Sequence, residues 1–116
     1  MSKVLVVDDN AAHRTLLDDA LTLAGHTVQT WPSSMGVVAR IAQWAPEVVL
    51  LDVILPPRNG WAVLADIRQA HLPVRVYMMS AGFPVTAAAA RLLGADGVIS
   101  KTGDFLGDAE RAVAGP

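Results

Sequence analysis

Short apolar runs alternate with segments of helical periodicity along this chain. Each run is followed by polar or turn-forming residues, and the segments between runs carry apolar residues three or four positions apart. This alternation is typical of βαβ units built around a parallel sheet. We therefore expect five strands, at Lys3–Val7, Thr27–Trp31, Val48–Leu51, Val76–Met79 and Gly97–Ile99.

The segments between these runs predict five helices. The first has Asn10 as its N-cap, Gly25 just after its end, and an apolar stripe from Leu16 to Ala24 that we expect to face the sheet. Prolines end the second and third helices, because proline cannot continue a helix. The predicted ranges are Ala11–Ala24, Ser34–Gln43, Gly60–Ala70, Thr86–Leu93 and Asp104–Ala114.

The order of these elements predicts an α/β fold with a doubly wound, five-stranded parallel sheet and helices on both faces. Right-handed crossovers leave few topologies, and strand order 2-1-3-4-5 is the leading one for five strands. The 116 residues suit one domain spanning residues 1–116, with no effector domain among them. In this order strands 1 and 3 are neighbours, and ligands bind beyond their carboxyl ends.

Composition narrows the possible functions. A formal net charge of -2 gives no basic stripe for direct nucleic-acid binding. The absence of cysteine excludes disulfides, thiol catalysis and cysteine metal ligands. No apolar run approaches the ~18 residues that span a bilayer, and we see no signal-peptide pattern. We expect a cytoplasmic protein that does not bind membranes.

Three acids lie at the ends of the first and third predicted strands. Asp8 and Asp9 follow the first strand, and Asp52 follows the third. If these strands are neighbours, three carboxylates converge and repel one another unless protons or a cation neutralise them. Oxygen ligands without thiols favour Mg²⁺, or the similar Mn²⁺, and Mg²⁺ also accepts phosphate oxygens.

The fourth and fifth strands end in residues that suit a phosphoryl group. Ser80 offers a hydroxyl and Lys101 an ammonium, which together with Mg²⁺ could hold three phosphoryl oxygens. No base candidate is near Ser80, whereas an aspartate can form an acyl phosphate. We expect Asp52 to be the nucleophile, because it stands alone at the central strand while Asp8 and Asp9 suit a shared cation.

These residues occur in an order that resembles the response-regulator receiver domain of two-component signalling, across essentially the whole chain. Each element alone is weak evidence, but the ordered set is specific. The set comprises Asp8-Asp9, Asp52 followed by Pro56 and Gly60, Ser80-Ala81, Gly94-Ala95-Asp96-Gly97, and Lys101.

The resemblance implies a signalling switch. Asp52 matches the phosphoacceptor, which takes its phosphoryl group from a histidine kinase or a histidine phosphotransferase. Ser80 matches the hydroxyl that turns toward the phosphoryl group, and Lys101 matches the cation that pairs with it. Such a domain catalyses only its own phosphorylation and dephosphorylation, so we expect a switch and not an enzyme with a separate substrate.

The resemblance also implies the Mg²⁺ ligands and the output surface. The direct ligands would be Asp9, Asp52 and the backbone carbonyl of Ile54, with Asp8 acting through water. The face formed by the fourth helix, fifth strand and fifth helix would contact a downstream protein. We expect a monomer or a weak dimer.

Two positions depart from the family pattern and keep an alternative open. Val98 stands where the family usually has a switching aromatic ring, and Thr102 stands where a cis-forming proline usually follows the lysine. The alternative is a pseudo-receiver, a protein-interaction module that works without phosphorylation. A flavodoxin-like cofactor binder is disfavoured by the lack of a phosphate loop, and a haloacid-dehalogenase-type phosphatase by Ile54 in place of a second acid.

We assign no functional role to the histidines and tryptophans. We expect the three histidines to face solvent and the three tryptophans to be half-buried packing residues. These residues are His13, His26, His71, Trp31, Trp44 and Trp61.

Overall fold

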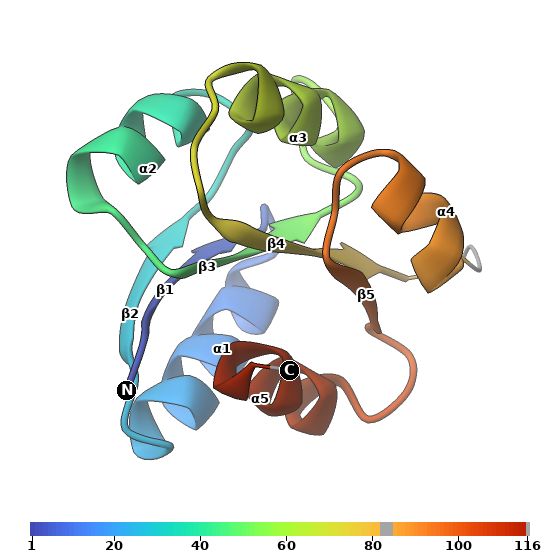
Figure 1. The fold of residues 1–116 in the computed structure, drawn as a ribbon. Helices are drawn as coiled ribbons and strands as arrows, with labels where there is room; N and C mark the ends of the chain where they lie inside the picture. Colours follow the sequence, from blue (N-terminus) through green and yellow to red (C-terminus); the bar gives the residue numbers. More distant parts are fainter. Residues whose placement is uncertain (82–84, 116) are drawn as a thin grey trace.

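The computed structural model describes residues 1–81 and 85–115, which form a five-stranded parallel sheet with helices on both faces (Figure 1). The strand order is β2-β1-β3-β4-β5, as the sequence predicted. The strands are β1 Lys3–Val7, β2 Thr27–Trp31, β3 Val48–Asp52, β4 Arg75–Ser80 and β5 Gly97–Ser100.

The helices form a layer on each face of the sheet (Figure 1). One layer consists of α1 and α5, and the other of α2, α3 and α4. The helix bounds are α1 Ala11–Leu23, α2 Val37–Trp44, α3 Gly60–Gln69, α4 Ala87–Leu92 and α5 Phe105–Ala114. Within the described residues, each of these helices is too short or too polar to cross a bilayer.

The central strands are buried on both faces, which explains their unbroken apolar sequences. In β1, Val4 and Val6 pack toward α1 and α5, whereas Leu5 and Val7 pack toward α2 and α3. The residues of β3 alternate in the same way. Strand alternation therefore divides the core into two layers, one on each face of the sheet.

Two sequence predictions about helices were wrong. The second helix begins at Val37 and not at Ser34, because Gly36 has a left-handed backbone (φ 78°) that a right-handed helix cannot include. The Ser34 side chain accepts a hydrogen bond from the Arg58 backbone. Ser34 thus lies in a loop that the β3–α3 loop holds in place. In α1, only Leu17 and Leu21 are buried, while Leu16 is 48% exposed, so the stripe that faces the sheet is narrower than predicted.

Candidate functional site

The carboxyl ends of β1 and β3 bring three acids together, as predicted from the sequence. Val7 pairs with Leu51 across these strands, so Asp8 and Asp52 extend from neighbouring strand ends. Carboxylate oxygens of Asp8, Asp9 and Asp52 all lie within 4.8 Å of one another. Asp8 and Asp52 are 0% and 6% exposed, whereas Asp9 is exposed.

Local hydrogen bonds fix the orientation of Asp8. Its Oδ1 accepts a hydrogen bond of 2.9 Å from the Asn10 backbone, at the start of α1. Its carbonyl oxygen accepts one of 2.7 Å from the Arg14 guanidinium, one turn into the same helix. These contacts leave Asp8 Oδ2 directed toward the other strand ends, where it meets Lys101.

Asp52 is held by the loop that follows it. The Ile54 backbone N–H donates to Asp52 Oδ1 at 3.3 Å, and the Gly60 N–H donates to the Val53 carbonyl at 2.7 Å. Gly60 packs so closely that a Cβ there would lie 2.0 Å from the Asp52 carbonyl oxygen. Only glycine allows α3 to begin this close to β3.

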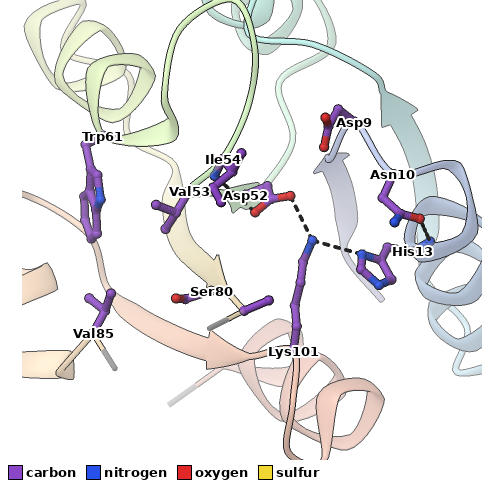
Figure 2. Close-up of a pocket in the computed structure, with 11 residues that line it drawn as sticks. Asp9, Asn10, His13, Asp52, Val53, Ile54, Trp61, Ser80, Val85 and Lys101 are labelled. Atoms are coloured by element: carbon purple, nitrogen blue, oxygen red, sulfur yellow. Dashed lines mark hydrogen bonds and ion pairs between the residues drawn. The ribbon is translucent and has the colours of Figure 1, made fainter. Parts of the chain in front are cut away.

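Lys101 lies between the two buried acids. Its Nζ donates to Asp8 Oδ2 at 2.6 Å and to Asp52 Oδ2 at 2.8 Å, and its side chain is 5% exposed. Figure 2 shows the contact with Asp52. The Lys101 backbone N–H donates to the Ser80 carbonyl at 2.8 Å, which ties the β5–α5 loop to the end of β4. One cation thus offsets part of the repulsion between two buried carboxylates.

The surroundings of Asp52 shift its acidity. The pKa of Asp52 is raised from 3.8 to about 6, chiefly because the side chain is buried. The hydrogen bond from Lys101 opposes this rise, and the neighbouring Asp8 contributes to it through its hydrogen-bond contact and its charge. The site therefore disfavours a second anion next to Asp8, and additional positive charge would stabilise the ionised form of Asp52.

A cavity of about 440 Å³ opens over these side chains (Figure 2). Its polar wall includes Asp9, Asp52, Ser80 and Lys101, which the sequence singled out. Its apolar wall comes from the β3–α3 loop, the start of α3 and the segment before α4, and includes Ile54, Trp61 and Val85.

Comparison with known proteins identifies the family. Residues 4–106 match the family model of the response regulator receiver domain. The chain is a receiver domain. It is 38% identical over 85 residues to the DNA-binding transcriptional regulator NtrC of Salmonella typhimurium, an alignment covering 73% of this chain and 18% of that protein. It is 37% identical over 95 residues to the transcriptional regulatory protein TcrA of Mycobacterium tuberculosis, covering 82% and 36%.

Solved structures agree with this assignment. NtrX from Brucella abortus superposes with a TM-score of 0.83 at 32% identity, over 97% of this chain and 27% of that one. The receiver domain of a LuxO repressor protein from Vibrio parahaemolyticus superposes with a TM-score of 0.88 over 97% and 87% of the two chains. Its 23% identity supports the fold alone. The chain spans only a minor part of these two relatives, 18% of NtrC and 36% of TcrA.

The donor set of this receiver domain fits a hard divalent cation. The cluster consists of three carboxylates. Asp9 is exposed and lines the cavity. The negative charge of the two buried acids, Asp8 and Asp52, is only partly offset by Lys101. Ile54 also lines the cavity, with its side chain largely exposed. Oxygen donors beside solvent are the environment in which Mg²⁺ keeps several of its waters.

The prediction that all three histidines face solvent was wrong for two of them. His13 lines the cavity and its Nδ1 lies 3.0 Å from Lys101 Nζ. His26 accepts a 3.1 Å hydrogen bond from the Ser2 backbone, and only His71 is exposed. A signal for His13 existed in its position, because the first turn of α1 starts at the same sheet edge as Asp8.

The two departures from the family pattern are structurally accommodated. Val98 is half-buried and packs against the core layer of α2, α3 and α4. The Lys101–Thr102 bond is trans, and the cis bond found in the described part of the chain is Pro56–Pro57. The Thr102 backbone and hydroxyl both contact the Ser100 hydroxyl, which shapes the loop after Lys101. The half-buried interpretation of the three tryptophans was confirmed.

Proposed function

We propose that this receiver domain is a phosphorylation-dependent switch in which Asp52 accepts a phosphoryl group from a histidine kinase or a histidine phosphotransferase. The observation that carries the proposal is the 2.8 Å contact between Asp52 Oδ2 and Lys101 Nζ at the wall of an open cavity. A nucleophilic carboxylate, a cation and an entry path occur together there.

The proposed transfer uses groups that already line the cavity. A carboxylate oxygen of Asp52 attacks phosphorus, the phosphorus–nitrogen bond to the donor imidazole breaks, and its electron pair stays on the imidazole nitrogen. The product is an acyl phosphate on Asp52. The Lys101 ammonium then pairs with one phosphoryl oxygen, and the Ser80 hydroxyl donates to another.

Mg²⁺ would be held by Asp9, Asp52 and the Ile54 carbonyl, with Asp8 acting through water. When bound, it supplies positive charge to the phosphoryl oxygens. Lys101 adds positive charge from the β5 side, where it already bonds Asp8 and Asp52. Together these charges lower the repulsion between the attacking carboxylate and the incoming anion.

The proposed output is a change in protein contacts at the face formed by α4, β5 and α5. A depression of about 460 Å³ lies on this face, and its walls include Val98, Arg91 and Arg111. We propose a downstream protein partner, a cytoplasmic location, and a monomer or weak dimer.

Intact-mass measurement tests the proposal. The native chain, incubated with a small acyl phosphate and Mg²⁺, should gain one phosphoryl mass, and Asp52→Asn should gain none. Asp19→Asn is a matched control, because Asp19 is exposed on α1 outside the cavity, and it should behave like the native chain. No gain in the native chain, together with no binding of a beryllofluoride mimic, would support the pseudo-receiver instead.

A further inference from the structure

The His13 imidazole is the third group in contact with the Lys101 ammonium. His13 Nδ1 lies 3.0 Å from Lys101 Nζ, and Figure 2 shows this contact beside the one with Asp52. Asp8 is the other group that Lys101 contacts. His13 Nδ1 is 3.6 Å from Asp8 Oδ2, which is too long for a hydrogen bond. The hydrogen-bond contact of the imidazole therefore goes to Lys101 and not to Asp8.

The number of hydrogen-bond donors on Lys101 indicates which nitrogen of His13 accepts. An ammonium has three N–H donors and no acceptor, and Lys101 Nζ has three acceptors within 3.0 Å. Because an ammonium cannot accept, this contact forms only in the tautomer in which Nδ1 accepts and Nε2 carries the proton. The three contacts satisfy all the donors of a cation that is almost fully buried.

One contact fixes the His13 backbone and another fixes its ring. The His13 backbone N–H donates to the Asn10 side chain at 3.1 Å, so His13 belongs to the capped first turn of α1. The Phe105 ring, at the start of α5, meets the imidazole edge to face with centroids 5.6 Å apart and planes at 70°. An aromatic contact in this arrangement restricts the ring to few orientations.

We propose that His13 is a positioning residue for Lys101, a role that rests on the proposed function of Asp52. As a neutral acceptor, the imidazole orients the ammonium without adding negative charge that would repel an incoming phosphoryl group. When Asp52 becomes an acyl phosphate, Lys101 exchanges its contact with Asp52 for a phosphoryl oxygen. The contacts with His13 and Asp8 persist, so only one of the three hydrogen bonds is remade.

A pair of substitutions separates this role from simple packing. His13→Leu removes the acceptor and should slow phosphoryl uptake from a small acyl phosphate about 3- to 10-fold, the value of one net hydrogen bond. His13→Gln restores an acceptor and should recover most of that loss. Thr15→Leu places the same side chain at an exposed α1 position outside the cavity and should leave the rate unchanged.

Two rate outcomes would overturn the proposal. A rate for His13→Leu equal to that of the native chain would show that the contact has no role in the reaction. An equally slow His13→Gln would show that only the shape of the imidazole matters. Thermal melts of each variant identify any loss that comes from unfolding.

A spectroscopic arm tests the contact without any phosphorylation. Nitrogen-15 NMR of the imidazole should show His13 with an unprotonated Nδ1 and a protonated Nε2, and Lys101→Met should shift the Nδ1 resonance. A protonated Nδ1 in the neutral ring would overturn the proposal. If the native chain takes up no phosphoryl group, the proposed function fails, and this measurement still decides whether His13 accepts from Lys101.

Discussion

Burial sets the chemistry of Asp52. The side chain lies beside a second buried acid, Asp8, and both share one ammonium from Lys101. Loss of water raises the pKa of Asp52 to about 6, and Lys101 recovers part of the cost. Asp52 is thus ionised at neutral pH, and its ionised form destabilises the folded chain.

Replacing Asp52 should therefore stabilise the metal-free fold at neutral pH. The folded-state pKa exceeds the unfolded value of 3.8, so the folded state binds the proton more tightly. The contribution of Asp52 to the free energy of unfolding therefore decreases as the pH rises from about 4 to about 6. At pH 7.5, Asp52→Asn should be more stable than the native chain by about 1–3 kcal/mol.

Urea unfolding in the presence of a chelator measures this difference. The stability gap between Asp52→Asn and the native chain should widen as pH rises from about 4 to about 7. Asp19→Asn controls for the loss of one surface charge and should show no such widening. A gap that stays constant with pH would mean that burial does not penalise the Asp52 carboxylate.

The packing of helix α3 against strand β3 depends on one close backbone contact. The first residue of α3, Gly60, faces the carbonyl oxygen of Asp52, where any Cβ would overlap backbone atoms. Asn59 caps the same helix by accepting from the Ala62 N–H at 2.9 Å. The start of α3 thus fixes both the loop that carries Ile54 and the backbone of the proposed phosphoacceptor.

Gly60→Ala should therefore damage both the fold and the site. The added methyl group must displace backbone at the end of β3, at a cost of about 1–3 kcal/mol or more. Gly103→Ala is the matched control, because a Cβ there meets nothing closer than 3.9 Å, at the Ser100 side chain. Chemical denaturation should show a large loss for the first variant and little for the second, and equal losses would contradict the packing argument.

Binding of a cation to the acid cluster should affect the stability of the whole fold. The acids come from two strands at the centre of the sheet, so a cation that binds them stabilises the folded chain only. The cluster itself is assembled from contacts between distant segments, since Lys101 and Asp8 are 93 residues apart in the sequence. Unfolding therefore abolishes the site.

Mg²⁺ should consequently raise the thermal stability of the native chain, and chelation should reverse the gain. At roughly ten times its dissociation constant, a ligand of the folded state contributes about 1.4 kcal/mol. Asp9→Asn should lose most of this gain, whereas Asp19→Asn should keep it. Differential scanning calorimetry with and without Mg²⁺ measures the effect, and an equal gain in Asp9→Asn would remove Asp9 from the ligand set.

The sequence by itself determined the architecture and the approximate content of the site. Apolar runs and capping residues are local signals, so the strands, their order and most helix ends could be predicted. Parallel strands end at one edge, so the convergence of Asp8, Asp9 and Asp52 also followed from the sequence.

Only the tertiary structure decided which side chains touch. The bond between the Arg58 backbone and the Ser34 side chain joins two loops, and the exposure of Leu16 depends on how α1 lies on the sheet. The contact of His13 with Lys101 depends on the side-chain orientations at the start of α1 and the end of β5. Such contacts join segments far apart in the sequence, and no local periodicity encodes them.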